Sequence, residues 1–199
     1  MVFLRSSTRQ GAELELQGRE VILRAPQMTD YAGWAELRAL SRAQLEPYEP
    51  SWTRDELSRA AFRQRLRHYS REMAQDLGYA FFIFAAAGDP LLGAVTLSNV
   101  RRGVAQTASA GYWIGTPHMG QGRMTAALRL LAPFAFRNLH LHRLEAGCVV
   151  DNLASVRVLE KSGFSREGLA RQYLRINGGW RDHLLFARLS GDAVEEALP

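Results

Sequence analysis

Apolar positions divide the chain into short runs typical of strands and longer periodic stretches typical of helices. The run Val-Ile-Leu-Arg at residues 21–24 predicts a strand that ends before Pro26. Apolar side chains at helical spacing then predict a helix over residues 29–41, with Thr29 as its N-cap. Two prolines stand three positions apart in residues 45–50, which excludes a regular helix and indicates a loop.

A second helix is expected over residues 53 to about 77. Thr53 and Glu56 have the spacing of a capping box, in which a hydroxyl and a carboxylate each accept from a free backbone N–H. Several arginines along this segment cannot face the core: Arg59, Arg63, Arg65, Arg67 and Arg71. A solvated helix face is the favoured interpretation of them, and a binding patch is the alternative.

The remaining pattern predicts one α+β domain. Three strands at residues 79–86, 91–99 and 105–114, joined by short connections rich in Gly and Pro, indicate an antiparallel meander. The last of these strands also begins a central strand–helix–strand–helix unit. It continues with a helix over 124–138, a strand over 143–150 and a helix over 152–162. Strands at 165–176 and 180–189 enclose Asn177-Gly178, a strong signal for a terminal β-hairpin. We expect the domain to span residues 19–190, with an N-terminal extension (1–18) and a C-terminal tail (191–199).

Composition excludes several functional classes. The 199 residues, 47% of them hydrophobic, are enough for one core, and the sequence has no uncharged apolar run long enough to span a membrane. One cysteine, Cys148, cannot form an internal disulfide, so a reducing, cytoplasmic location is expected. It forms no ligand cluster with the five histidines, so no metal site is expected. The net charge of +5 favours a polyanionic partner, either a phosphate-bearing cofactor or RNA, and does not choose between them.

A glycine-containing loop, Gly120-Gln121-Gly122, stands between a predicted strand and a predicted helix and is followed by Arg123. Backbone N–H groups at such a helix start converge on an anion, and pyrophosphate is their natural ligand. The third glycine of a dinucleotide fingerprint is replaced by Thr125, and no Gly-Lys-Ser/Thr is present, so both nucleotide motifs are excluded. Taken alone, the loop leaves phosphate binding and an ordinary flexible connection equally open.

Two motifs together resemble one family. Residues 120–124 resemble the acetyl-CoA pyrophosphate loop of the GNAT acetyltransferases, and residues 152–155 with 159–164 resemble the helix that follows it. The ending Asn177-Gly178-x-Trp180-x-Asp182-His183 is similar to the ribosomal-protein-alanine N-acetyltransferase branch, as are residues 47–50 and 98–106. Met119 and Met124 depart from the usual loop residues. Because backbone groups make the phosphate contacts, these departures leave the expectation of CoA binding in place.

The resemblance implies a GNAT-like mixed sheet in which the strands ending near Ile114 and Val150 diverge around the pantetheine of acetyl-CoA. A backbone N–H at or near Ile114 would polarise the thioester carbonyl. Asn152 would bind the pantetheine amides, act as a helix N-cap, or do both. The residues expected to bind the cofactor are Trp113, Ile114, Gly115, Met119, Gly120, Gln121, Gly122, Arg123, Met124, Thr125, Asn152 and Ser155.

Ser155 is the expected proton donor to the leaving thiolate, with Tyr173 as the second candidate; Ser155 is otherwise a small residue that gives the cofactor clearance. The strand at 108–115 carries no carboxylate, so a general base would act through water, and Glu145 and Glu49 are unranked candidates. At pH 7 roughly one-tenth of an α-amine is in the neutral form, against about 0.04 per cent of a lysine side chain. The lack of a strong base on this strand therefore favours an α-amine as the acceptor. The family transfers acetyl directly, so Cys148 is expected to pack rather than react.

The resemblance to the ribosomal-protein-alanine branch implies that the acceptor is the N-terminal Ala of a ribosomal protein. A small-molecule amine, such as an antibiotic or polyamine, is the alternative, and a non-catalytic CoA-binding or rRNA-binding module is favoured only by the basic charge. The expected acceptor-binding residues are Tyr48, Glu49, Trp52, Asn99 and Tyr112. In the loop before residue 53, carboxylates could attract an ammonium and aromatics could pack on a short side chain, or the loop could simply connect two helices.

Overall fold

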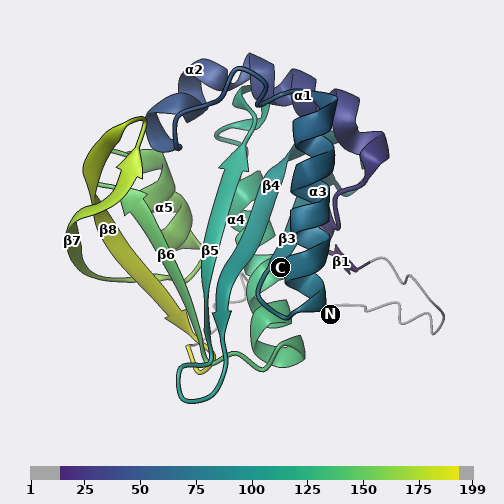
Figure 1. The fold of residues 1–199 in the computed structure, drawn as a ribbon. Helices are drawn as coiled ribbons and strands as arrows, with labels where there is room; N and C mark the ends of the chain where they lie inside the picture. Colours follow the sequence, from purple (N-terminus) through teal and green to yellow (C-terminus); the bar gives the residue numbers. More distant parts are fainter. Residues whose placement is uncertain (1–13, 193–199) are drawn as a thin grey trace.

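The computed structural model describes residues 14–192, and these form an open sheet with helices on both faces (Figure 1). In the described part the sheet has eight strands in the order β1-β2-β3-β4-β5-β6-β8-β7. Their bounds are β1 Glu15–Gln17, β2 Val21–Arg24, β3 Tyr79–Ala85, β4 Gly88–Arg101, β5 Thr107–Ile114, β6 Arg143–Val149, β7 Ser165–Ile176 and β8 Gly179–Leu189. The helices are α1 Tyr31–Leu40, α2 Arg42–Leu45, α3 Arg59–Ala74, α4 Arg123–Pro133 and α5 Leu153–Lys161.

Six of the seven neighbouring strand pairs are antiparallel, and only β5 and β6 are parallel. The meander is β3–β4–β5, and the terminal hairpin is β7–β8. The crossover between β5 and β6 contains α4, as a parallel connection requires. The predicted mixed α+β sheet with a meander and a terminal hairpin is therefore confirmed.

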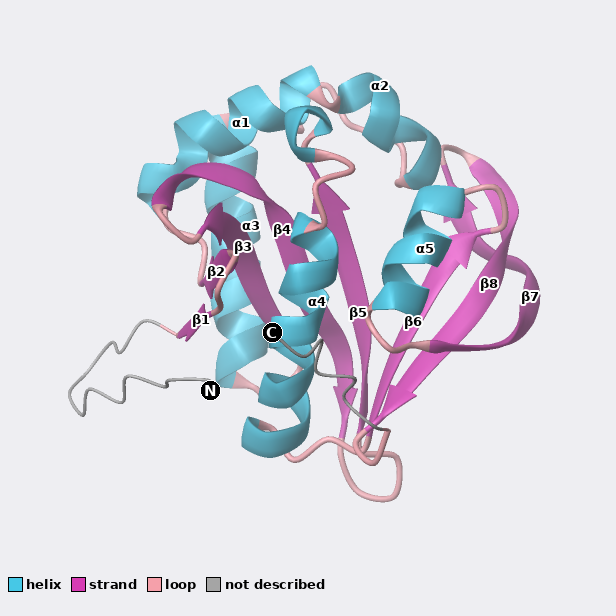
Figure 2. Ribbon diagram, turned by 180° about the vertical axis from the view of Figure 1, so that it is seen from behind, coloured by secondary structure: helices cyan, strands magenta, loops and turns pink. Residues whose placement is uncertain are grey.

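The two faces of the sheet are covered by different helices. Figure 1 shows α1 and α3 on one face, and Figure 2, seen from behind, shows α4 and α5 on the other. Phe62 of α3 and Trp34 of α1 pack on the first face, while Leu128 and Leu131 of α4 pack on the second. Because strand side chains alternate between faces, neighbouring positions of one strand contribute to different clusters. We call the α1/α3 side the front face and the α4/α5 side the back face.

The predicted start of the second helix is wrong. Helix α3 begins at Arg59, and the hydroxyl of its N-cap Ser58 accepts from the N–H of Ala61 at 3.1 Å. The Thr53 hydroxyl donates to Asp55 instead, and the Glu56 carboxylate pairs with Arg65 at 2.5 Å. Both members of the expected capping box thus have other partners. The sequence has the spacing of a capping box at residue 53, but Thr53 and Glu56 bind Asp55 and Arg65 instead, and the helix starts after Ser58.

Three other boundaries differ from the prediction. A 3₁₀ turn, Met28–Asp30, precedes α1, and the N-cap of α1 is Asp30 rather than Thr29. The Asp30 carboxylate accepts from the N–H of Gln27 at 2.7 Å. The turn between β3 and β4 lies at residues 86–87, so Asp89 and Pro90 belong to β4. Strand β1 was not predicted, and it pairs with β2 at the sheet edge.

Candidate active site

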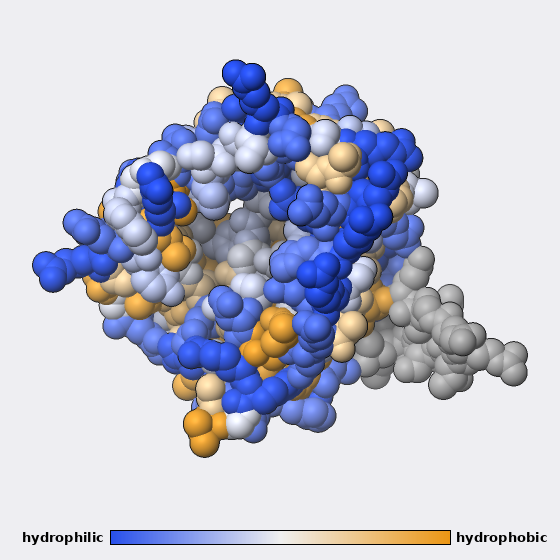
Figure 3. Space-filling view, in the orientation of Figure 1, coloured by the Kyte–Doolittle hydropathy of each residue, from blue (hydrophilic) through white to orange (hydrophobic). Residues whose placement is uncertain are grey.

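The site begins where two neighbouring strands separate. β5 and β6 pair only from Thr107–Arg143 to Ser109–Glu145, after which β5 continues against β4 alone and β6 against β8 alone. Residues 110–114 and 146–149 therefore each have one strand edge without a neighbour. A cleft of roughly 690 Å³ lies between them, and Figure 3 shows the molecule hollowed through at its centre. Free strand edges of this kind can pair with an extended amide-bearing ligand as an added strand would.

One end of the cleft is the start of α4. Gly120 and Gly122 have φ values of 70° and 74°, in the left-handed region that glycine adopts without strain. Gly122 is the N-cap of the 11-residue helix, and the first-turn N–H groups there have no partner within the helix. Arg123 and Thr125 of that turn line the cleft. Unpaired N–H groups and the positive end of the helix dipole make this turn suited to a phosphate group.

Further positive charge surrounds this end of the cleft. Arg129 of α4 and Arg157 and Lys161 of α5 line it together with Arg123. Arg129 donates through Nε and Nη2 to the backbone oxygen of Lys161, at 3.0 and 2.6 Å, which fixes the two helices against each other. Sequence reasoning missed Arg129 and Arg157. The available signal for Arg129 was its position seven residues, or two helical turns, after Gly122.

Asn152 and Ser155 lie at the start of α5. The Asn152 side chain accepts from the N–H of Ser155 at 3.0 Å, so its predicted N-cap role is confirmed. Both residues line the cleft. The cap uses only the side-chain oxygen of Asn152, so its amide nitrogen still has hydrogen atoms to donate to a ligand. A contact between Asn152 and pantetheine stays a prediction.

Ser155 is hydrogen-bonded to Tyr112 across the cleft. Its Oγ lies 2.7 Å from the Tyr112 hydroxyl, which joins the start of α5 to β5. Burial raises the pKa of Tyr112, so the phenol keeps its proton at neutral pH. Burial also raises the pKa of the neighbouring Cys148 to about 11. Cys148 is therefore a thiol rather than a reactive thiolate at neutral pH, in agreement with a packing role.

A loop crosses the front of the cleft. Residues 46–52, which we call the bridging loop, begin with the 3₁₀ turn Glu46–Tyr48, and Tyr48 and Glu49 line the cleft. The N–H of Asn177 in the β7–β8 turn donates to the Glu49 backbone oxygen at 2.9 Å. The loop therefore reaches from α2 to the hairpin. At its base, the Ser41 hydroxyl accepts from the N–H of Thr116 at 2.9 Å, tying the α1–α2 corner to the segment that leads from β5 to the glycine loop.

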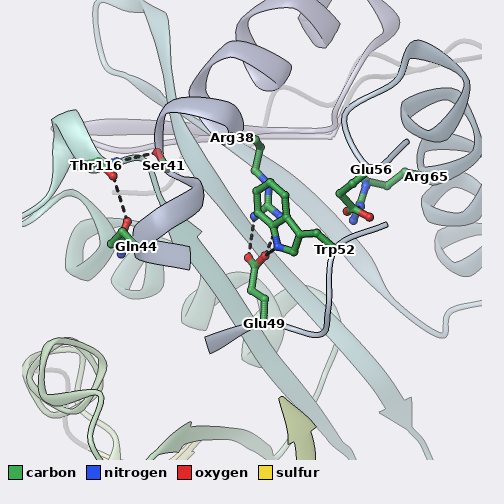
Figure 4. A network of polar contacts seen from close by, with 8 residues as sticks. All are labelled: Arg38, Ser41, Gln44, Glu49, Trp52, Glu56, Arg65 and Thr116. Carbon is green, nitrogen blue, oxygen red and sulfur yellow. Dashed lines mark hydrogen bonds and ion pairs between the residues drawn. The ribbon is translucent and has the colours of Figure 1, made fainter. Parts of the chain in front are cut away.

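The Glu49 carboxylate accepts three hydrogen bonds from two residues (Figure 4). Nη1 and Nη2 of Arg38 donate to its two oxygens at 2.6 and 2.7 Å, and Nε1 of Trp52 donates at 2.8 Å. Arg38 is only 5% exposed, and its guanidinium lies 4.3 Å from the Trp52 ring and 5.0 Å from the Trp113 ring. Glu49 thus neutralises a buried cation. This geometry assigns Glu49 and Trp52 to holding the bridging loop in place rather than to contacting an ammonium.

Several predicted site residues do not line the cleft: Glu145, Tyr173, Asn99, Trp52, Gly115 and Gln121. Glu145 stands in the paired part of β6, where Arg143 and Arg101 bind it at 2.9 and 3.4 Å, so the structure does not support it as a base. Tyr173 is 50% exposed, with its ring edge-on to His183, and the structure does not support it as a proton donor.

The other three corrections have local causes. Asn99 lies at the irregularity of β4 between Ser98 and Arg101, beyond the open edge of β5. Gly115 packs against the Leu37 side chain, which leaves no room for a Cβ. The Gln121 side chain donates to the Pro117 oxygen at 3.0 Å. Each of these residues stands beside the cleft in sequence, but its side chain or backbone is engaged elsewhere.

The fold and this cleft define an acyltransferase class. Residues 20–165 match the family model described as "Acetyltransferase (GNAT) domain", which covers most of the chain. The protein belongs to the GNAT acetyltransferases and is an N-acetyltransferase that takes acetyl-CoA as its donor. The described residues contain no group of His, Cys, Asp and Glu that could hold a metal ion. No helix in this part of the chain is long and apolar enough to cross a membrane.

Similar proteins support the same class. The chain is 40% identical over 177 residues to Probable N-acetyltransferase YjcK of Bacillus subtilis, covering 89% of this chain and 98% of that protein. It is 32% identical over 158 residues to the ribosomal protein uS5-alanine N-acetyltransferase of Escherichia coli, covering 79% and 81%. Among solved structures, Mycobacterium smegmatis RimJ in complex with CoA-disulfide has a TM-score of 0.81 at 32% identity, covering 94% and 88%. The ribosomal-protein-S5-alanine acetyltransferase from Vibrio fischeri has a TM-score of 0.82 at 27% identity, covering 90% and 98%.

The Arg38–Glu49 pair yields a prediction about stability. Glu49→Ala should lower the free energy of unfolding by about 3–5 kcal/mol, because it leaves the Arg38 charge buried without a partner. Glu46→Ala is the matched control: Glu46 pairs with Arg42 at the exposed surface, where the loss should be within about 0.5 kcal/mol. Urea unfolding measures both. Equal losses for the two variants, or a Glu49→Gln variant of parental stability with a raised KM for a peptide acceptor, would return Glu49 to the acceptor site.

Proposed function

We propose that the protein transfers acetyl from acetyl-CoA to the N-terminal α-amine of a protein, with a ribosomal protein that begins with Ala as the target. The observation that carries this proposal is the cleft that opens through the sheet between β5 and β6 and is crossed in front by the bridging loop. A thioester between the two strand edges would be reached from the front only by a narrow group, such as a chain end. The relative named as a ribosomal protein uS5-alanine N-acetyltransferase supports the acceptor class.

Pyrophosphate would bind the turn at residues 120–125, and pantetheine would lie between β5 and β6. The N–H of Gly115 donates to the Leu92 oxygen of β4 at 2.8 Å. Because successive N–H groups of a strand point to opposite sides, the N–H of Ile114 faces the opening. That N–H would polarise the thioester carbonyl and hold the oxyanion of the tetrahedral intermediate. Asn152, on the opposite side, would meet the pantetheine amides.

In the reaction, the amine lone pair attacks the thioester carbonyl carbon and the C–S bond then breaks. The departing thiolate takes a proton from Ser155, and the Tyr112 hydroxyl, 2.7 Å from Ser155 Oγ, replaces it. The raised pKa of Tyr112 keeps this relay protonated until sulfur leaves. The attacking nitrogen loses one proton as the amide forms, and solvent restores the proton of Tyr112 after CoA leaves. The sequence predicted Tyr112 to bind the acceptor and Tyr173 to be the second candidate proton donor. In this proposal Tyr112, rather than Tyr173, acts with Ser155 as a proton donor.

An α-amine suits this cleft better than a lysine. Its acidic lining residues in the described part of the chain are Glu20, beside the glycine turn, and Glu49, which is paired with Arg38. With no unpaired carboxylate near Ser155, an acceptor that is already one-tenth neutral at pH 7 has an advantage of about two orders of magnitude over lysine.

A panel of acceptors tests the proposal through thiol release from acetyl-CoA. We expect an Ala-starting peptide to react about a hundredfold faster than the same peptide with a blocked N-terminus and one internal lysine. Spermidine serves as the small-amine acceptor. Fastest turnover with spermidine would assign the enzyme to small amines, and fastest turnover with the blocked peptide would assign it to lysine side chains.

The placement of pyrophosphate predicts the effect of Gly122→Val. We expect the KM for acetyl-CoA to rise at least about tenfold, since a branched side chain blocks the anion and disfavours a φ of 74°. Gly103→Val is the control, because Gly103 has a φ of 64°, equal free space around it and no place in the cleft. Similar acetyl-CoA kinetics in the two variants would move the pyrophosphate site elsewhere.

The proton relay predicts that Ser155→Ala lowers kcat about a hundredfold with the KM for acetyl-CoA nearly unchanged, because the hydroxyl acts only as sulfur leaves. Tyr112→Phe should have a smaller effect, as it removes only the second member. Steady-state kinetics with the Ala-starting peptide measures both. If Ser155→Ala stays within a factor of two and Tyr112→Phe does not, tyrosine protonates sulfur directly and Ser155 is a spacer.

A further inference from the structure

His183 is a buried imidazole that the mechanism above does not use. It is 2% exposed, yet it lines the cleft from β8, opposite Val149 of β6. Tyr173 of β7 packs edge-on against its ring, with the ring centroids 5.6 Å apart. A polar ring enclosed on its sides and facing a cleft is well suited to contact a bound molecule.

The hydrogen bond of the ring fixes its tautomer. Nδ1 lies 2.9 Å from the backbone oxygen of Arg181, and a carbonyl oxygen only accepts, so Nδ1 carries the proton and donates it. Nε2 of the neutral ring is therefore the unprotonated nitrogen and has no hydrogen-bond partner among the described residues. This is the state of an imidazole that can accept a proton.

The ring and the Ser155–Tyr112 pair lie on opposite faces of the sheet. Leu184, Cys148 and Tyr112 face the back, where the cluster under α4 and α5 contains them. His183 precedes Leu184 on β8, so by alternation it faces the front. The front is also the side of Trp113 and of the bridging loop. An acceptor entering from the front would reach the thioester past His183, while sulfur would leave toward Ser155 at the back.

The charged and titratable groups around His183 leave it free to act. Arg181 is paired with Asp151 at 2.8 Å, and the Asp182 carboxylate accepts from the N–H of Gln172 at 2.8 Å. Glu49 of the bridging loop is held by Arg38. The other titratable or charged side chains on the surrounding strands are Arg166, Glu167, Arg171, Tyr173 and Arg175 on β7, Arg143, Glu145 and Cys148 on β6, Arg188 on β8 and Tyr112 on β5.

We infer that Nε2 of His183 is the general base that takes the proton from the attacking amine. The inference rests on the proposed amine acceptor. As the N–C bond forms, the amine nitrogen becomes positive, and one N–H proton passes to Nε2 while Nδ1–H stays bound to the Arg181 oxygen. The C–S bond then breaks, and sulfur receives its proton from Ser155. The proton on His183 returns to solvent after the acetylated chain leaves.

The test compares His183→Gln with His142→Gln. Glutamine keeps a polar side chain but accepts no proton, and His142 is exposed and lies outside the cleft. We expect His183→Gln to lower kcat/KM for the peptide about a hundredfold or more, with the Kd for acetyl-CoA unchanged, and His142→Gln to match the parent.

A second measurement needs no variant. In the ¹⁵N spectrum of the histidine rings of the unaltered protein, the His183 signal should show the Nδ1–H tautomer, and it should shift when the peptide binds. A predominant Nε2–H tautomer, or a His183→Gln rate within threefold of the parent, would overturn the inference. If the parent itself turns over no peptide, the proposed acceptor fails, whatever the result for His183.

Discussion

The function of this fold depends on the point at which β5 and β6 cease to pair. Their parallel ladder ends at Ser109 and Glu145, and beyond it each strand keeps only its outer neighbour. Backbone groups that a closed sheet would satisfy internally are then left at two facing edges. The glycine turn, the start of α5 and the bridging loop are all arranged around this opening. A ladder only a few residues longer would fill the place that the thioester must occupy.

The opening also brings together residues from two faces of the sheet. Lining residues of α4, α5 and the back of β5 stand on one side, whereas the bridging loop and His183 stand at the front. Ser155 and Tyr112 are 43 positions apart in sequence, and Arg38 and Glu49 come from a helix and a loop on the opposite face. The hydroxyl of Ser155 and the imidazole of His183 are thereby separated by the thickness of the sheet.

Local sequence signals predicted the helices, strands and turns better than they predicted which residues line the cleft. Asn177-Gly178 indicated the hairpin, Asn152 indicated the cap of α5, and Gly120 with Gly122 marked the connection before α4, because each depends on backbone geometry within a few residues. Glu145 and Tyr173 were misplaced because strand pairing and side-chain direction decide whether a strand residue reaches the cleft. The Thr53 box failed for a similar reason: Arg65, nine residues further along, holds Glu56.

Because the two strands part within the sheet, residues of both faces line the cleft: Arg123 and Ser155 on the side of α4 and α5, and Tyr48 and Glu49 of the bridging loop on the other. A donor bound at the start of α4 would therefore leave the front of the cleft to the acceptor. The bridging loop is held from beneath by the Arg38–Glu49 ion pair, and Arg38 is only 5% exposed. Lifting this loop would therefore carry the cost of leaving a buried charge without its partner.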